Sequence, residues 1–260
     1  MLAVALFAAT PVAAQTEALI EALAPVLAAE DARRFDAAAL QRAAGSPDSV
    51  VRRLTAMAVG RIGDPRGVPL LLTLYADPDS TVRPAAAFAL GLLRDTSAVA
   101  PIIARLGQPP ALDAETVAES ITALARIGGA RAGEWMGGVL ERRVPLLVPD
   151  TLAAVQTIVG EAWRLGDAAP VTALLPFLRD TSLVARGAAV YTLGRLRAPA
   201  ASSGIIAALS DRDAGIRAAA ARALTRTYAE AAELAPATTA GLLLRLTDDR
   251  TTDVRIAALR

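Results

Sequence analysis

The sequence predicts an all-α fold, a right-handed α-solenoid (an α-α superhelix) of about six to seven two-helix repeats. In residues 77–106, a turn rich in Asp and Pro precedes two short runs of apolar residues with helical spacing. The unit recurs, because the position that ends its first helix returns at intervals of 31 to 38 residues: Gly60, Gly91, Ala125, Trp163, Gly194 and Thr225. Two such helices cannot bury their apolar faces alone, so the copies are expected to stack in a row.

The composition favours a core of small side chains and excludes several chemistries. Hydrophobic residues make up 54% of the chain, but aromatic residues only 3%. All 27 basic residues are Arg, and Lys, Asn, His and Cys are absent. Without His or Cys there is no imidazole base, no thiol nucleophile and no zinc site of the usual kind. No motif places two carboxylates across a pocket, so we expect no catalytic, cofactor-binding or metal-binding residue.

Residues 1–14 are expected to be a signal peptide. Their apolar run has the length of a signal-peptide core, and small residues precede Gln15. The run is too short to span a bilayer. The alternative is a first buried helix of the array. A genuine leader implies export to the periplasm or the exterior, and its absence implies a cytoplasmic protein.

Residues 15–45 are expected to form two N-terminal capping helices, because they lack the Val-Arg register of the later copies. Residues 46–260 are expected to form the array. A last copy begins at Asp248, and position 260 falls inside its first helix. We therefore expect the array to be truncated there, with Ile256 and Leu259 forming an apolar edge. The earlier repeats are expected at 46–75, 77–106, 111–140, 151–178, 180–209 and 211–246.

One arginine recurs in phase at the start of the first helices: Arg52, Arg83, Arg186, Arg217 and Arg255. One hypothesis is a basic stripe for a polyanion, which the net charge of +1 disfavours. We favour a structural ladder, because each Arg follows an acidic turn and can pair within or between turns. Exposed ion pairs contribute only ~0–1 kcal/mol each, so the ladder would set register more than stability.

Large aromatic and basic residues of the second helices are the candidates for contact with a partner: Tyr75, Trp135, Arg142, Arg143 and Arg245. For Tyr75 and Trp135, core packing is the favoured interpretation, and contact with a partner is the alternative. Trp163 replaces Gly60 in the repeat register and is expected to pack between helices.

The motif D-P-R-G-V-P at 64–69 and the D-x-x-V-R openings of the repeats resemble HEAT repeats of the short bacterial type. The resemblance covers residues 46–260. It implies that the second helices line a concave groove that suits proteins or peptides. The function expected first is a non-catalytic protein- or peptide-binding scaffold without a cofactor, nucleic-acid binding or a membrane span, in an oligomeric state that stays open.

Other classes stay open. The stretches 51–72 and 85–99, with a leader that ends A-A-Q, resemble exported bacterial proteins in which a HEAT array precedes a cyclophilin-type peptidyl-prolyl isomerase domain. That resemblance implies a client- or partner-binding array with a catalytic domain beyond Arg260. HEAT-like chromophore lyases, which act on bilin-carrying proteins, share only the generic repeat. HEAT-like DNA glycosylases need a basic concave face, which the near-neutral charge disfavours.

Overall fold

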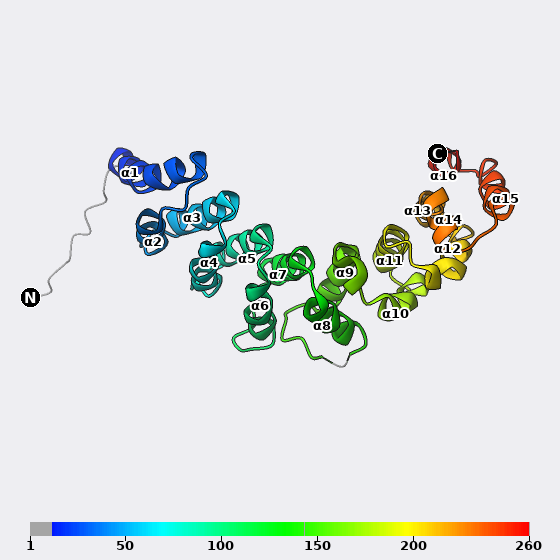
Figure 1. The fold of residues 1–260 in the computed structure, drawn as a ribbon, viewed down its shortest axis with the longest axis horizontal. Coiled ribbons are helices and arrows are strands. Elements are labelled where there is room, and N and C mark those ends of the chain that lie inside the picture. The colour runs from blue at the N-terminus through cyan, green and yellow to red at the C-terminus, as the bar shows by residue number, and fades with distance from the viewer. Residues whose placement is uncertain (1–11, 143, 260) are drawn as a thin grey trace, which may run out of the picture. The chain divides into compact units, whose positions relative to one another are not determined.

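The computed structural model describes residues 12–142 and 144–259, and in that part of the chain the regular secondary structure is all helix. Within each of its two compact units, Figure 1 shows successive helices packed side by side, as expected for an α-solenoid. Residues 1–11 of the expected signal peptide lie outside the described residues. The chain divides into two compact units, residues 1–95 (unit 1) and residues 96–260 (unit 2).

Unit 1 holds the two N-terminal helices, the first regular repeat and the first helix of the second repeat. α3 packs against α1 and α2 on one side and against α5 on the other. Its dry interior is made by Val51, Val59, Leu71, Leu74 and Leu90, all at most 2% exposed. The elements are α1 (Val12–Asp31), α2 (Ala37–Ala44), α3 (Ser49–Ile62), η1 (Pro65–Gly67), α4 (Val68–Tyr75) and α5 (Val82–Leu93).

The turn residues give α3 its ends. Asp48 caps the helix by accepting a hydrogen bond from the Val50 N–H at 2.8 Å. Gly63 ends it in the left-handed region, at φ 76°, where a residue without Cβ is favoured. Asp64 then caps η1, and Pro65 stands at its first position, where no N–H is needed.

Unit 2 continues the same plan with two irregular repeats. The elements are η2 (Thr96–Ala98), α6 (Val99–Leu106), α7 (Ala114–Ile127), α8 (Ala130–Leu140), α9 (Thr151–Glu161), η3 (Ala162–Ala168), α10 (Val171–Leu174), η4 (Leu175–Arg179), α11 (Leu183–Arg195), η5 (Pro199–Ala201), α12 (Ser202–Ala208), α13 (Ala214–Ala223), α14 (Arg226–Ala231), α15 (Pro236–Leu246) and α16 (Thr252–Ala258). The second helix of the fourth repeat is split between α10 and η4, and the expanded sixth repeat gains α14.

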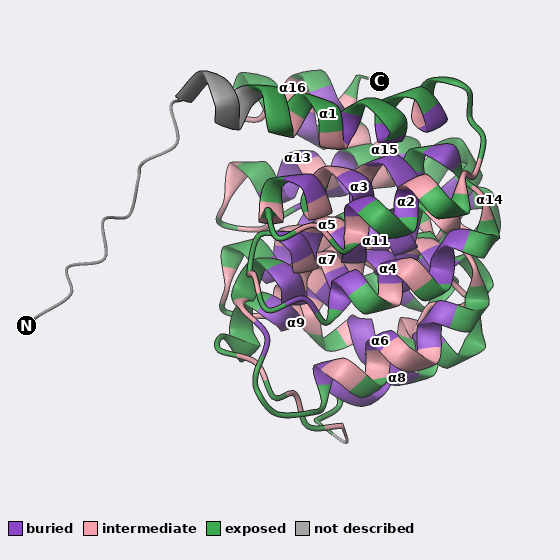
Figure 2. Ribbon diagram, turned by 90° about the vertical axis from the view of Figure 1, so that its left-hand side faces the viewer, coloured by how far each residue is buried: buried purple, intermediate pink, exposed green. Residues whose placement is uncertain are grey.

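Each helix has a buried side and an exposed side, which Figure 2 shows as purple and green along the same ribbon. α8 forms despite its glycines, because they allow close contacts. A Cβ on Gly133 would overlap the Ala168 carbonyl oxygen, and one on Gly138 would lie 2.7 Å from a Val144 methyl. The glycines that weaken α8 by propensity are therefore required by its packing.

The first helices of unit 2 (α7, α9, α11 and α13) lie on the inner side of that unit's curve, and the second helices lie outside (Figure 1). The expectation that the second helices line the inner side is therefore wrong for unit 2. First helices of this unit also meet closely, since an added Cβ on Gly194 would lie 2.7 Å from the Ala223 Cβ.

Candidate functional site

The phased arginines form a ladder between successive repeats. Arg52 Nε and Nη2 donate to Asp77 Oδ2 and Oδ1 at 2.7 and 2.8 Å. Its Nη1 donates to the backbone carbonyls of Ser46 and Pro47 at 2.9 and 3.1 Å. One guanidinium thus joins the turn of its own repeat to the turn of the next. The Arg52 hydrogen bond is the main cause that holds the Asp77 pKa below its ordinary value.

The same geometry recurs in unit 2. Arg186 donates to Asp211 at 3.1 and 3.3 Å, and Arg217 donates to Asp249 at 2.8 and 3.0 Å. The hydrogen bond from Arg217 lowers the Asp249 pKa to about 2. Two further members of the series, Arg83 and Arg255, keep the bonds to the carbonyls of their own turns.

The ladder is structural, as expected, but the expectation that its pairs are exposed is wrong. Arg186 and Arg217 are 6% and 7% exposed, and Asp77 is 7% exposed. Bidentate, charge-assisted pairs with so little contact with water are stronger than surface pairs. The ladder therefore contributes to stability as well as to register, and its arginines are not available to a polyanion.

The predicted contact residues do not form one surface. Tyr75 and Trp135 are 2% and 8% exposed, so both belong to the core, which is the interpretation favoured from the sequence. Arg142 follows α8 with a left-handed backbone, at φ 59°, and Arg245 is an exposed residue in the last turn of α15. Arg143 lies outside the described residues. Of this set, only Arg142 and Arg245 stay candidates for partner contact, and they belong to different repeats.

A different cluster lies at the C-terminal ends of the first helices in unit 2. We call it the arginine–aromatic face and define it by six residues: Trp163, Arg164, Tyr191, Arg195, Arg197 and Arg222. Trp163 reaches this face because α9 ends at Glu161 and the chain continues as the 3-10 helix η3. A continued α-helix would direct Trp163 at the position where Gly60 meets a neighbouring helix. Trp163 was expected to pack between helices, but its side chain is only half-buried and part of it faces solvent.

Trp163 is the centre of this face. The guanidinium carbons of Arg164 and Arg195 lie 4.4 and 3.8 Å from its ring centroid. Tyr191 meets the same ring edge-to-face, with centroids 6.3 Å apart, and accepts a 3.4 Å hydrogen bond from Arg195 Nη1. Cation–π contacts of this kind hold a guanidinium in place without neutralising its charge. The stack therefore presents a fixed positive charge beside exposed aromatic surface.

A groove of about 410 Å³ continues the face from α11 to α13. It is lined by Tyr191, Arg195, Arg197 and Arg222 together with small residues. Among the described residues no carboxylate lies within ion-pair distance of Arg195, Arg197 or Arg222. Arg195 and Arg222 also lie in the last turns of α11 and α13, where the helix dipole favours a cation. The groove is thus a concentration of positive charge that the fold holds in place but does not pair.

Sequence reasoning missed this face, although a signal was present. A second arginine recurs one position after the register mark: Arg61, Arg126, Arg164, Arg195 and Arg226. Three of these arginines form ion pairs with acidic residues: Arg61 with Glu30, Arg164 with Glu161, and Arg226 with Glu230. Arg195 has no acid at a comparable position and stacks on Trp163 instead. In this series, an arginine without a nearby acidic residue therefore indicates the arginine–aromatic face.

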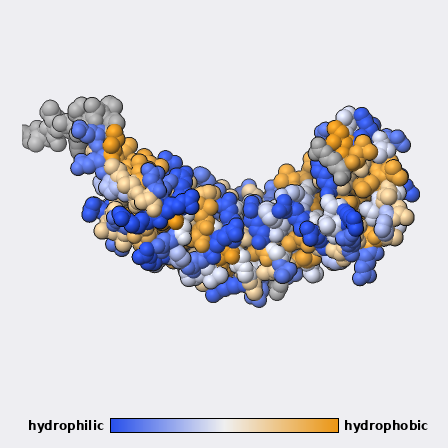
Figure 3. Space-filling view, turned by 45° about the horizontal axis from the view of Figure 1, so that its top comes forward, coloured by the Kyte–Doolittle hydropathy of each residue, from blue (hydrophilic) through white to orange (hydrophobic). Residues whose placement is uncertain are grey.

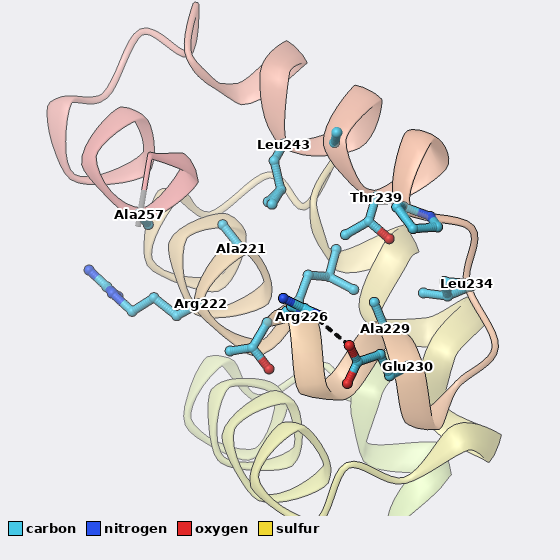
Figure 4. A pocket seen from close by; sticks show the side chains of 13 residues that line it. Ala221, Arg222, Arg226, Ala229, Glu230, Leu234, Thr239, Leu243 and Ala257 are labelled. Carbon is cyan, nitrogen blue, oxygen red and sulfur yellow. Dashed lines mark hydrogen bonds and ion pairs between the residues drawn. The ribbon is translucent and has the colours of Figure 1, made fainter.

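The sixth repeat holds an apolar pocket of about 660 Å³ beside this groove. Its walls come from α13, α14, α15 and α16. In Figure 4, Leu243 reaches from α15 towards Ala221 of α13, and the Arg222 side chain extends away from the pocket interior. Arg222 and Thr225 line both the pocket and the groove. The two hollows therefore adjoin, one apolar and one cationic.

Glu119 of α7 is the one described carboxylate whose pKa burial shifts clearly upwards, against the opposing charge of Arg126. Its Oε2 is buried and accepts no hydrogen bond from the described residues. A raised native pKa means that the folded state holds this proton to higher pH than the unfolded state. Glu119 therefore costs stability as pH rises from the unfolded pKa of about 4.3 through the native one.

Replacing Glu119 by Gln should remove that cost. The variant should be more stable than the parent at pH 7, by about 1 kcal/mol or less because the side chain is only partly buried. The difference should shrink towards pH 4, where both states of the parent carry the proton. Urea unfolding between pH 4 and 7 measures it. A variant that loses stability at pH 7 would show that the carboxylate is favourably paired.

Figure 3 shows apolar and hydrophilic surface interleaved over unit 2. Large exposed apolar residues of this unit include Leu152, Val184 and Tyr191 on first helices. No helix in the described ranges is long and apolar enough to cross a bilayer. The same residues hold no cluster of three or more acidic or other ligating side chains placed to bind a metal ion.

Comparison with known proteins assigns the family. HEAT repeats match residues 13–86, 36–124 and 153–260. Among solved structures, YibA of E. coli is similar at 13% identity and a TM-score of 0.52, over 96% of this chain and 87% of YibA. An engineered protein is similar at 19% identity and 0.50, over 96% and 74%.

A further solved structure, the complex of CpcE and CpcF of phycocyanin lyase from Nostoc, is similar at 20% identity and a TM-score of 0.44. It covers 89% of this chain and 96% of its own. These likenesses concern the fold. The search of curated proteins gave no match. With matches along most of its length and the stacked helical hairpins described above, this chain belongs to the HEAT-repeat proteins.

Proposed function

We propose that this protein is a non-catalytic scaffold that binds a protein or peptide on the inner side of unit 2, at the arginine–aromatic face. The observation that carries the proposal is the set of arginines on that face with no acidic partner, beside an exposed Tyr191. Arg and Tyr are enriched at protein interfaces, where a stacked guanidinium and a rigid ring lose little freedom on binding. A shallow groove of this kind suits a macromolecular partner better than a small substrate.

A second possibility concerns the whole gene. An array that precedes a peptidyl-prolyl isomerase domain would hold a client on the same face, so both readings make the same prediction for this chain. Reading the coding frame beyond codon 260 separates them. An open frame that encodes such a domain favours the isomerase, and any other continuation or a stop codon rejects it.

Site-specific photo-crosslinking tests the proposed face. A photoreactive amino acid is placed at Tyr191 on the inner side of unit 2, or at Ser203 on α12 as the matched outer position. Both residues are exposed. In cells that produce the chain, we expect a small set of protein adducts at position 191 that is absent at 203. The same adducts at both positions, or none above background at 191, would contradict the proposal.

A further inference from the structure

We infer that the partner segment is an acidic peptide with one bulky apolar side chain, which enters the sixth-repeat pocket while its carboxylates pair with the arginines of the groove. This inference rests on the proposed function and deepens it. It commits the face to one class of partner.

The positive charge of the groove favours a partner with negative charge. Arg195, Arg197 and Arg222 line one groove, and no described carboxylate pairs with any of them. Arg195 is held by Trp163 at 3.8 Å, so binding would immobilise little that is not already ordered. A guanidinium binds a carboxylate through two parallel hydrogen bonds. Each unpaired arginine is therefore a ready contact for one acidic side chain.

The adjoining pocket selects the second feature. Its walls are mostly apolar side chains such as Leu224, Leu234 and Leu243, and its volume of about 660 Å³ has room for a large side chain. The one carboxylate in the lining, Glu230, is paired with Arg226 at 2.8 Å (Figure 4). Arg222, at the boundary of pocket and groove, is exposed. A peptide that crosses α13 would thus place an apolar side chain on one side of Arg222 and its acidic residues on the other. Apolar anchors in pockets with a charged rim are the usual centre of a peptide interface.

A nucleic acid fits these features less well. The unit that carries the groove also has exposed acidic side chains, including Asp167, Asp248 and Asp253, and the whole chain has a net charge of +1. An extended polyphosphate would meet those carboxylates as well as the arginines. It would also leave the apolar pocket unused. The combination favours a short peptide whose charges are confined to the groove.

The test begins with a phage-displayed library of random 12-residue peptides selected on the intact 260-residue chain. We expect enrichment of sequences in which several Asp or Glu residues flank one Leu, Ile, Phe or Trp. Fluorescence anisotropy then gives the affinity of a labelled selected peptide for the protein and its variants. Arg195→Ala and Arg222→Ala should each weaken binding about fivefold to tenfold, as for loss of one partly exposed charge pair.

Two controls make the result specific. Arg131→Ala, an exposed arginine of α8 outside the groove, should leave the affinity unchanged. Ala240→Trp fills the pocket from α15 and should abolish the advantage of the apolar side chain over a Ser replacement in the same peptide. Circular dichroism of each variant confirms that it is folded.

The outcomes separate this inference from the proposed function. Selected peptides without acidic residues, or with an affinity that the Arg195 and Arg222 variants do not change, overturn the inference and leave peptide binding intact. Equal affinity for a 20-nucleotide single-stranded DNA overturns it in favour of a polyanion surface. Failure to enrich any peptide, together with no crosslink at Tyr191, contradicts both.

Discussion

Replacing Asp77 by Ala should destabilise the protein by about 2–4 kcal/mol, one of the largest effects of any single change in unit 1. The carboxylate accepts two hydrogen bonds from Arg52 and one from the Asp79 N–H at 2.9 Å. Without it, the Arg52 charge stays in place with a side chain that is only 14% exposed. The cost falls short of a fully buried pair because some water reaches the guanidinium. Urea unfolding at pH 7 measures it.

The same variant should also show how the stabilisation by Asp77 depends on pH. The native Asp77 pKa lies below the ordinary value, mainly because of Arg52, so its stabilisation is present above the unfolded pKa of about 3.9. It is lost as pH falls through the native pKa. The difference in the free energy of unfolding between parent and variant should therefore become smaller below about pH 4. Asp31→Ala, an exposed carboxylate without a described partner, is the control and should change stability little. If both variants lost the same amount of stability, the claim that the Arg52–Asp77 pair stabilises the fold would be wrong.

Replacing Gly60 by Leu should cost about 3 kcal/mol, the second large effect. A Cβ at Gly60 would lie 2.8 Å from the Ala89 Cβ and 2.9 Å from the Ala89 Cα. The Ala89 backbone cannot turn aside as a flexible side chain would, so α3 and α5 must separate. Thermal unfolding of the variant should show the loss. A variant as stable as the parent would mean that the two helices are not in such close contact.

Gly160→Ala is the matched control for that substitution. A Cβ at Gly160 would lie 4.0 Å from the Ala188 Cβ, which is an ordinary contact. The change should stabilise the protein slightly, by up to about 1 kcal/mol, because Ala favours a helix more than Gly. The opposite signs at two helical glycines would show that helix contact, and not helix propensity, decides the effect at Gly60.

The repeat period and the turn chemistry carry most of the fold. The in-phase positions from Gly60 to Thr225 place the first helices. Four of these helices (α3, α7, α9 and α13) are capped by an Asp of the preceding turn. Helix propensity alone misjudges α8, whose glycines are needed by close contacts with segments far along the chain. Such contacts become visible only when the repeats are stacked.

The candidate site could be predicted only in part. Burial decided against Tyr75 and Trp135, because an aromatic residue on a second helix has the same periodicity whether it faces the core or water. The position of Trp163 depends on a local change from α-helix to 3-10 helix, which no single residue of the sequence predicts. The arginines of the face could have been suspected from their phase. Their lack of acidic partners depends on which side chains the fold brings near.

The central claim is that each helical hairpin takes its dry interior from its neighbours, so that the effect of a change fades along the row. Hydrogen exchange of native Asp77→Ala against the parent, resolved by peptide along the chain, tests this most directly. The account predicts faster exchange in α3, α4 and α5 and unchanged exchange in α11, α13 and α16. Equal acceleration along the whole chain would show a single cooperative core and contradict it.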